Sequence, residues 1–253
     1  MTLCKFYFWR NQNPNQTGMV IKYSCILLLS ILLGILIFTE SKTIDEDFGN
    51  LARYRNSSLQ LASLPRGENL VVFMGDSITD WWPKRGNFFP GKKYVGRGIG
   101  GQTTPQMLLR FQQDVINLKP RVVVILAGTN DLNRETGNDC ATIEGNLQKM
   151  VALSRANNIK VVLATILPVC GKKIKNRPPA KISEINAWIK DFCDRTGVIY
   201  LDYYSAMVGS DGFMRQDLAD DCLHPNALGY EIMAPLAEKA IQQALKPPER
   251  IVM

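Results

Sequence analysis

Ser77 lies at the end of a stretch that joins an apolar run to small and polar residues. The run is residues 71–74, and Gly75 and Asp76 separate it from the serine. This pattern predicts a buried strand whose carboxyl end delivers a hydroxyl group into a turn. Open α/β sheets bind ligands at that end, and Gly75 would allow a sharp turn or the close approach of a substrate. An ordinary strand followed by a polar turn or helix cap has the same pattern, so this stretch alone does not establish a site.

His224 is the only histidine of the chain, and Asp221 precedes it by three residues. In a serine–histidine–aspartate site, the aspartate holds the tautomer of the imidazole and the other ring nitrogen accepts the serine proton. A lone histidine is more often structural or simply exposed. Any serine–histidine mechanism in this chain nevertheless requires His224, for which we expect an ordinary pKa of roughly 6.5.

A glycine-rich loop follows the second predicted strand. Residues 96–104 read Gly-Arg-Gly-Ile-Gly-Gly-Gln-Thr-Thr and contain G-x-G-x-x-G at 96, 98 and 101. Dinucleotide-binding proteins carry this motif after their first strand and an acidic residue about 20 residues later, near the position of Arg121 here. The motif therefore supports dinucleotide binding only weakly. The loop is either a glycine-rich turn or a source of backbone N–H groups that face a developing anion.

Asn130 belongs to a second polar loop, which follows the apolar run 122–126. An asparagine amide is a neutral donor that can hold an oxyanion. Because Asn and Asp are also common turn formers, this loop has a functional and a purely structural interpretation.

Apolar runs alternate with segments of helical periodicity over residues 68–246. Five short strands that alternate with helices predict a parallel sheet covered by helices on both faces. The predicted strands are residues 70–74, 93–95, 122–127, 160–165 and 198–201, and the predicted helices are residues 104–117, 142–157, 180–195 and 227–245.

The first 67 residues differ in composition from the rest. Residues 1–22 are polar and positively charged, residues 23–39 are uncharged and almost wholly apolar, and acidic residues follow from position 40. This order predicts a cytoplasmic segment at 1–22 and an exported domain. The apolar run is short for a membrane span and slightly long for a signal core, so we expect a signal anchor, with a cleaved signal peptide or a buried domain helix as alternatives. Residues 40–67 are expected to form a linker or a helix leading into the domain at 68–246, and residues 247–253 a tail.

The net charge of +7 is not concentrated in one block. Four basic residues and one acidic residue within positions 1–42 carry +3 of it, and the remaining +4 is spread over 211 residues. We therefore expect no nucleic-acid partner. With one histidine and no C-x-x-C pair, the sequence gives little support to a zinc site.

Four of the six cysteines belong to the predicted domain. An exported domain can form disulfides. Cys140, Cys170 and Cys222 each follow the carboxyl end of a predicted strand, so we predict one bridge among these three. Cys193 falls within a helical pattern and is predicted to be a buried thiol.

Four short sequence blocks occur in a fixed order along the chain. They are Gly-Asp-Ser, a glycine before Gln-Thr, Gly-Thr-Asn-Asp and Asp-x-x-His-Pro. These four blocks resemble those of the SGNH, or GDSL, hydrolase family, and the chain looks most like bacterial acylhydrolases related to platelet-activating-factor acetylhydrolase. The resemblance covers residues 68–246. Ile78 stands where the family has the leucine of Gly-Asp-Ser-Leu, and Cys222 is an unusual neighbour of the aspartate.

The resemblance implies a role for each matching residue. Ser77 matches the nucleophile, and Asp221 and His224 match the acid and the base. The backbone N–H of Ser77, the backbone N–H of Gly101 and the side chain of Asn130 match the oxyanion donors.

The choice of the loop glycine and the roles of two aspartates complete this assignment. Gly101 is preferred to Gly100 because the family glycine directly precedes the x-Thr pair. Asp76 and Asp131 are expected to shape their loops rather than to take part in catalysis.

The family implies an α/β fold, a three-layer α/β/α sandwich with a five-stranded parallel sheet in the flavodoxin-like order 2-1-3-4-5. That order makes strands 1 and 3 neighbours at the topological switch point, so Ser77 and Asn130 would lie close together. The implied chemistry is two-step acyl transfer through an acyl-enzyme, which needs no metal or cofactor.

The expected function is therefore that of a serine esterase, exported and tethered to a membrane by residues 23–39. Small acyl esters, O-acetylated sugars and lysophospholipids are candidate substrates. An acyltransferase acting on a glycan or lipid, or a catalytically idle domain that binds an acylated ligand, would have a similar sequence. The natural substrate, the acyl length and the oligomeric state do not follow from the sequence.

Overall fold

The computed structural model describes residues 27–28, 30, 48–63, 69–133 and 136–246. The chain divides into two compact units, residues 1–48 and 49–253, and the second contains every element discussed below. The predicted cytoplasmic segment, nearly all of the apolar run 23–39 and the tail lie outside the described residues. Within the described ranges, no helix is long and apolar enough to cross a bilayer.

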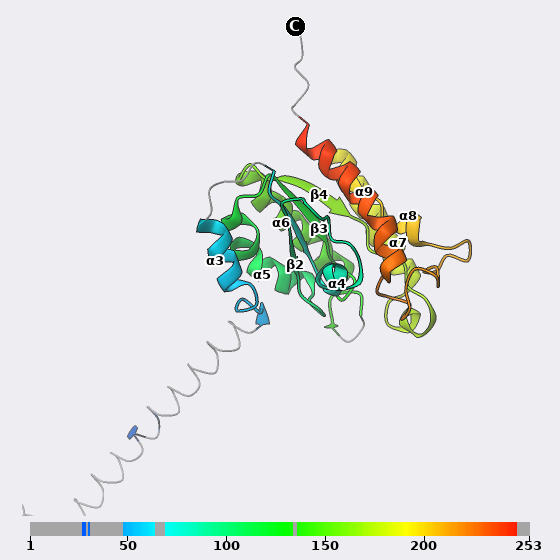
Figure 1. Cartoon of the computed structure of the whole chain (residues 1–253). Coiled ribbons are helices and arrows are strands. Elements are labelled where there is room, and N and C mark those ends of the chain that lie inside the picture. The colour runs from blue at the N-terminus through cyan, green and yellow to red at the C-terminus, as the bar shows by residue number, and fades with distance from the viewer. Residues whose placement is uncertain (1–26, 29, 31–47, 64–68, 134–135, 247–253) are drawn as a thin grey trace, which may run out of the picture. The chain divides into compact units, whose positions relative to one another are not determined.

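The second unit is built on a parallel sheet of five strands in the order β2-β1-β3-β4-β5 (Figure 1). The predicted fold class and strand order are therefore confirmed. β1 and β3 are apolar and wholly buried, as expected for central strands covered on both faces. The strands are β1 (Val71–Gly75), β2 (Tyr94–Gly98), β3 (Val122–Leu126), β4 (Lys160–Ala164) and β5 (Ile199–Leu201).

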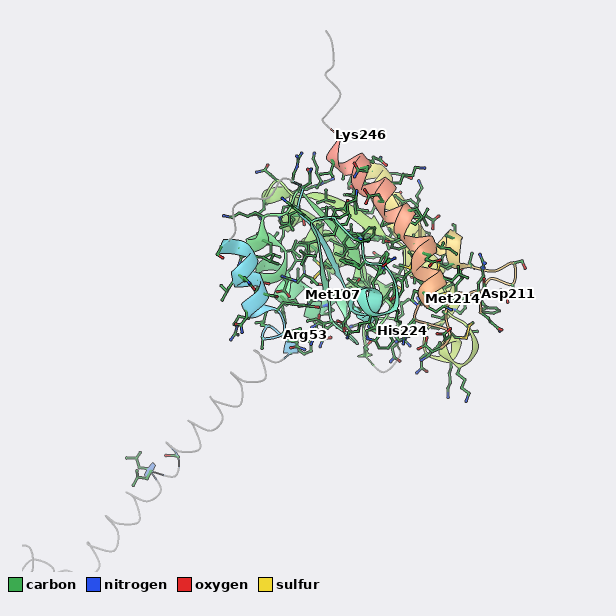
Figure 2. The ribbon with its side chains drawn as sticks, in the orientation of Figure 1. Arg53, Met107, Asp211, Met214, His224 and Lys246 are labelled. Carbon is green, nitrogen blue, oxygen red and sulfur yellow. A yellow bond between two sulfur atoms is a disulfide. The ribbon has the colours of Figure 1, made fainter. Side chains whose placement is uncertain are left out.

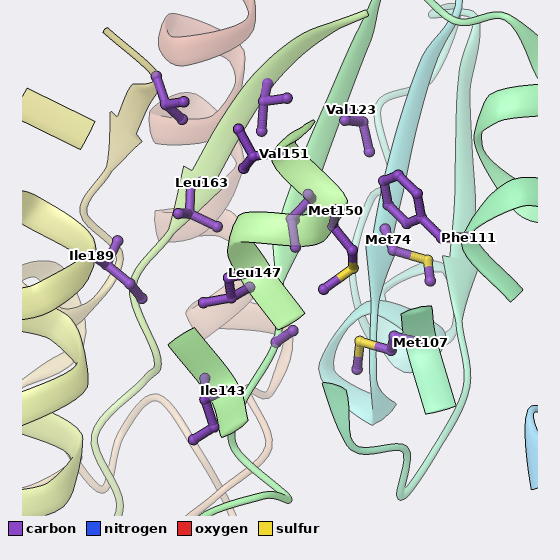
Figure 3. Packing of buried hydrophobic residues seen from close by; sticks show 14 of the residues in the cluster. Met74, Met107, Phe111, Val123, Ile143, Leu147, Met150, Val151, Leu163 and Ile189 are labelled. Atoms are coloured by element: carbon purple, nitrogen blue, oxygen red, sulfur yellow. The ribbon is translucent and has the colours of Figure 1, made fainter. Parts of the chain in front are cut away.

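Helices cover both faces of the sheet, and alternate strand residues pack against each layer. Val72 and Met74 share one apolar cluster with α5 (Thr104–Asp114), α6 (Cys140–Ala156) and α7 (Pro179–Thr196). Figure 3 shows side chains of α5 and α6 directed at the strands in this cluster.

Val71 and Phe73 point the other way, into the cluster formed with α4 (Ser77–Arg85) and α9 (Ala227–Leu245). The shorter helices are α3 (Arg55–Ser63), η1 (Ile116–Leu118), η3 (Gly171–Lys175) and α8 (Tyr204–Met207).

Helix α4 was not among the predicted helices, although it follows β1 directly. Its N-cap is Asp76, whose carboxylate accepts a hydrogen bond from the backbone N–H of Ile78 at 2.9 Å. The helix is only nine residues long and contains Pro83, so its helical periodicity is weak. Ser77 is its first residue, which means that the helix-cap interpretation of this stretch and the nucleophile interpretation both fit the structure.

A cluster of aromatic rings packs α4 against the sheet. Phe73 of β1 lies at its centre, with ring centroids of its neighbours 5.1–5.9 Å away in mostly edge-on or tilted arrangements. The neighbours are Trp82, Phe88, Phe89 and Tyr94. This packing fixes the position of the helix that begins with Ser77.

Gly75 has a packing role that its sequence did not suggest. It is the last residue of β1, and a Cβ atom there would lie 2.2 Å from Oγ1 of Thr79 and 2.9 Å from the carbonyl oxygen of Leu126. The first turn of α4 therefore packs directly on the end of β1. Glycine is required for this close packing.

Residues 49–63, which the sequence placed in a linker or a leading helix, make specific contacts with the rest of the unit. The hydroxyl of Tyr54 donates to the carbonyl of Gly98 at the end of β2. In α3, Ser58 is buried and donates to Asp114 of α5 at 3.3 Å.

Candidate active site

Ser77, His224 and Asp221 form a continuous chain of hydrogen bonds. Ser77 Oγ lies 2.9 Å from His224 Nε2, and His224 Nδ1 lies 2.6 Å from Asp221 Oδ2. An ionised carboxylate only accepts hydrogen bonds, so the proton of the neutral ring is on Nδ1 and Nε2 is free to accept the serine proton. The structure thus brings together the three residues matched to the catalytic triad.

The short segment 221–224 fixes the orientation of the imidazole. Asp221 Oδ1 accepts hydrogen bonds from the backbone N–H groups of Leu223 at 3.1 Å and His224 at 2.8 Å. Burial alone would raise the pKa of Asp221, but the backbone and ring hydrogen bonds from His224 lower it to about 2. The carboxylate is therefore ionised at neutral pH. Asn226 caps α9 immediately afterwards, so the base is held at one end of α9, opposite Lys246 (Figure 2).

His224 is mostly buried, and its pKa is lower than the ordinary value expected from the sequence. Burial is the main cause, the carboxylate of Asp221 acts in the opposite direction, and the positive charges of Arg85 and Lys173 lower the pKa further. The imidazole is therefore neutral at neutral pH, as a general base must be.

Trp81 contacts the base from α4. Its ring centroid lies 4.1 Å from that of His224, and the guanidinium of Arg85 lies 4.3 Å from the indole centroid. Ser77, Trp81 and Arg85 follow one another at intervals of four, which places them on one face of α4. Trp81 and Arg85 were not predicted as site residues, because α4 itself was not predicted from the sequence.

Asn130 lies in the loop that follows β3, and β3 pairs directly with β1, the strand that leads to Ser77. Asn130 Nδ2 donates to the carbonyl of Gln102 at 3.0 Å. Its Oδ1 accepts from Nη2 of Arg177 at 3.0 Å. Arg177 could not be predicted from a local sequence pattern, because this contact joins segments 47 positions apart.

The glycine-rich loop runs next to Ser77. A methyl group added at Gly100 would lie 3.8 Å from Cβ of Ser77. Gly101 follows with φ at +79°, a left-handed conformation that favours glycine, and it stays the predicted backbone donor.

Asp131 holds the end of the glycine-rich loop where α5 begins. Its carboxylate accepts hydrogen bonds from the backbone N–H of Thr104 at 2.9 Å and from the Thr104 hydroxyl at 2.6 Å. Thr104 is the first residue of α5, so the carboxylate occupies the helix N-terminus at which a pyrophosphate would bind. The dinucleotide interpretation of the glycine motif is therefore disfavoured, and the loop-shaping role expected of Asp131 agrees with these contacts.

A buried arginine ties this loop to the ends of two strands. Arg110 of α5 donates to the carbonyl of Gly75 at 3.0 Å, to the carbonyl of Arg97 at 2.9 Å and to Oε1 of Gln102 at 2.6 Å. It also pairs with Asp114 at 3.1 Å. Arg110 therefore fixes the positions of β1, β2 and the glycine-rich loop relative to one another.

The predicted disulfide is present, between Cys170 and Cys222. Cys140 is free and partly buried, and Cys193 is a buried thiol as predicted. Cys222 lies between Asp221 and His224, and Cys170 directly precedes η3. The bridge therefore connects the loop of the base to the segment that leads to Arg177.

No group of three or more His, Cys, Asp or Glu side chains in the described part of the chain is arranged to hold a metal ion. The chemistry available from the residues described above is nucleophilic attack by a serine, with proton transfer by a histidine and hydrogen bonds to an oxyanion.

Comparison with known proteins agrees with this type of site. The GDSL-like lipase/acylhydrolase family matches residues 73–232, and the chain belongs to this hydrolase family. The human platelet-activating factor acetylhydrolase IB subunit alpha2 is 30% identical over 190 residues, which cover 71% of this chain and 79% of that protein.

Solved structures are similar as well. A GDSL-like lipase from Bacteroides thetaiotaomicron has 38% identity and a TM-score of 0.74, with 79% of this chain and 100% of that chain covered. The lipase/acylhydrolase from Enterococcus faecalis has 26% identity and a TM-score of 0.60, with 72% and 99% covered.

Proposed function

We propose that this protein is a serine esterase that cleaves a carboxylic ester through an acyl-enzyme. The observation that carries the proposal is the hydrogen-bonded chain Ser77–His224–Asp221, with Asn130 in the loop that follows the neighbouring strand β3. Family membership supports the same class of reaction.

In the first step, Ser77 Oγ attacks the ester carbonyl while His224 Nε2 takes the hydroxyl proton. Asp221 stabilises the imidazolium that forms. The N–H groups of Ser77 and Gly101 and the Nδ2 of Asn130 donate to the tetrahedral oxyanion. The bond to the alcohol then breaks, the imidazolium gives its proton to the leaving oxygen, and the acyl group stays on Oγ.

In the second step, a water molecule replaces the alcohol. His224 takes a proton from the water molecule while the water oxygen attacks the acyl carbonyl. The carboxylic acid leaves, and the proton returns to Oγ of Ser77. The residues of the first step serve again, with the histidine acting first as base and then as acid.

The proposed substrates are short-chain acyl esters, and the proposed location is the exported side of a membrane. The substrate class takes its support from similarity to a platelet-activating factor acetylhydrolase subunit. The location takes its support from the charge pattern around the apolar run 23–39 and from the disulfide, a bond typical of oxidising compartments.

A fluorophosphonate probe tests the nucleophile, because it forms a covalent bond only with an activated serine. We expect the intact mass to increase by one probe and peptide analysis to place it on Ser77. Ser77→Ala and His224→Ala should abolish labelling and hydrolysis of p-nitrophenyl acetate. Ser57→Ala, which changes an exposed serine of α3, is the matched control and should leave both unchanged. Labelling of another serine, or normal turnover of His224→Ala, would overturn the proposal.

A further inference from the structure

Arg177 is a buried cation close to the proposed oxyanion hole. It lies between η3 and α7, and only 8% of its surface is exposed. Its Nε donates to the carbonyl of Thr129 at 2.9 Å, and its Nη2 donates to Oδ1 of Asn130 at 3.0 Å. A buried guanidinium is costly unless it is well hydrogen-bonded, so these contacts hold Arg177 firmly against residues 129–130.

The hydrogen bonds of Asn130 determine which way its amide faces. Arg177 can only donate, so it must meet the amide oxygen. The amide nitrogen then faces the site, where one of its N–H groups goes to the carbonyl of Gln102. A primary amide has two N–H donors, which leaves the second for an oxyanion.

A second effect of the arginine is electronic. A hydrogen bond from a charged donor is stronger than one from a neutral donor, and hydrogen bonds in a chain polarise one another. Electron density drawn toward the amide oxygen makes the amide N–H groups better donors. The positive charge of Arg177 also acts on Asp76, the N-cap of α4. Burial raises the pKa of Asp76 to about 7, and the charge of Arg177 acts in the opposite direction.

We propose that Arg177 is a positioning residue of the oxyanion hole, which orients the Asn130 amide and strengthens its N–H as a donor to the tetrahedral intermediate. The inference rests on the function proposed above, because it requires Asn130 to be an oxyanion donor. Arg177 itself does not touch the reacting atoms. Its effect therefore belongs to the chemical step rather than to substrate binding.

The test is a comparison of kcat and KM for p-nitrophenyl acetate. Arg177→Met keeps most of the side-chain length and removes every donor. We expect kcat to fall about 10-fold or more, by less than the about 10²–10³-fold that follows loss of an oxyanion donor, with KM changed by less than about 2-fold. Arg177→Lys keeps the charge but loses the planar fork, so its kcat should lie between those of wild type and Arg177→Met. Lys175→Met, an exposed cation of the same segment, is the matched control and should have normal kcat.

A double-variant cycle separates positioning from a general structural role. If Arg177 acts through Asn130, then Arg177→Met combined with Asn130→Ala should be no slower than Asn130→Ala alone. If the fold-decreases in kcat of the two single variants multiply in the double variant, Arg177 does not act through Asn130 and the inference is wrong. Should Arg177→Met fail to fold, Arg177→Lys and its own double variant carry the same test.

The outcome also distinguishes this inference from the proposed function. Normal turnover of Asn130→Ala would remove Asn130 from the oxyanion hole and overturn both. A low kcat of Asn130→Ala together with a normal kcat of Arg177→Met would overturn only the role of Arg177.

Discussion

At the scale of single residues, Asn130 combines a proposed role as an oxyanion donor with hydrogen bonds that support the fold. Asn130→Ala should lower kcat by about 10²–10³ because it removes one oxyanion donor. The structure adds an expectation that the sequence did not suggest, since the variant also removes a hydrogen bond that the buried Arg177 donates to Asn130. That loss should lower the free energy of unfolding by about 1–3 kcal/mol. Steady-state kinetics and urea unfolding measure the two effects, with exposed Asn157→Ala as the control. Full turnover would remove Asn130 from the site.

His224 determines the response to acid. Its pKa is below the ordinary value, and a protonated ring cannot accept the serine proton, so kcat/KM should fall with pH only below about 6.5. Arg85 contributes to this lowering because its positive charge disfavours the imidazolium. Arg85→Gln should therefore raise the pKa and move the acid limb of the pH profile to higher pH.

The pH prediction has an internal control on the same helix. Lys84→Gln removes the preceding exposed charge, which is not among the main causes that lower the pKa of His224. Its acid limb should stay in place. The shift in Arg85→Gln should also become smaller at high ionic strength, because salt screens exposed charges. An acid limb that does not move in Arg85→Gln would show that Arg85 has no effect on the base.

At the scale of elements, the contact between β1 and α4 positions Ser77. Gly75→Ala would push the first turn of α4 off the strand, because its Cβ would meet Thr79 at 2.2 Å. We expect a loss of about 1–3 kcal/mol in the free energy of unfolding, together with lower kcat as Ser77 moves. Adding Thr79→Ala should restore part of the stability.

Another glycine provides the comparison for this substitution. Gly145 lies within α6, where an added Cβ meets no atom within 4 Å. Gly145→Ala should therefore stabilise the protein by about 0.5–1 kcal/mol. Thermal unfolding of the variants measures both changes. If Gly75→Ala has the same stability as the wild type, the close packing of α4 on β1 is not required.

The disulfide joins two segments of the site, so its removal should affect stability and turnover together. The bridge spans 52 positions, and the double variant Cys170→Ser/Cys222→Ser should lose about 2–4 kcal/mol of unfolding free energy. Its kcat should fall, because both the histidine loop and the segment before Arg177 lose this restraint. A reducing agent should lower the unfolding midpoint of the wild type and of the control Cys140→Ser, but not that of the double variant. Equal responses of all three proteins would contradict the bridge.

At the scale of the whole molecule, the charge pattern of residues 1–47 predicts the side of the membrane on which the domain lies. A reporter that functions only in the cytoplasm should be silent when fused after Met253. The same fusion lacking residues 1–40 should be active and serves as the control. A strong signal from the full-length fusion would contradict export.

The sheet could be predicted from sequence because its central strands are continuous apolar runs, and the strand order followed from the resemblance to a known family. The residues of the four blocks could be assigned in the same way. Helix α4 was missed because it is short and contains Pro83. Arg177 and Trp81 were missed because their importance depends on contacts across the fold, which no local pattern encodes. The role of Gly75 likewise became clear only once Thr79 was placed against it.

The hydrogen bond between Ser77 and His224 joins residues 147 positions apart, near the two ends of the folded unit. A ribosome therefore completes Ser77 long before it completes His224, and we expect a chain that stops before residue 224 to be inert. During refolding, circular dichroism would follow the formation of helices, whereas ester hydrolysis would start only when the loop before α9 reaches α4. Turnover should therefore report when the loop before α9 docks on α4, separately from the formation of secondary structure.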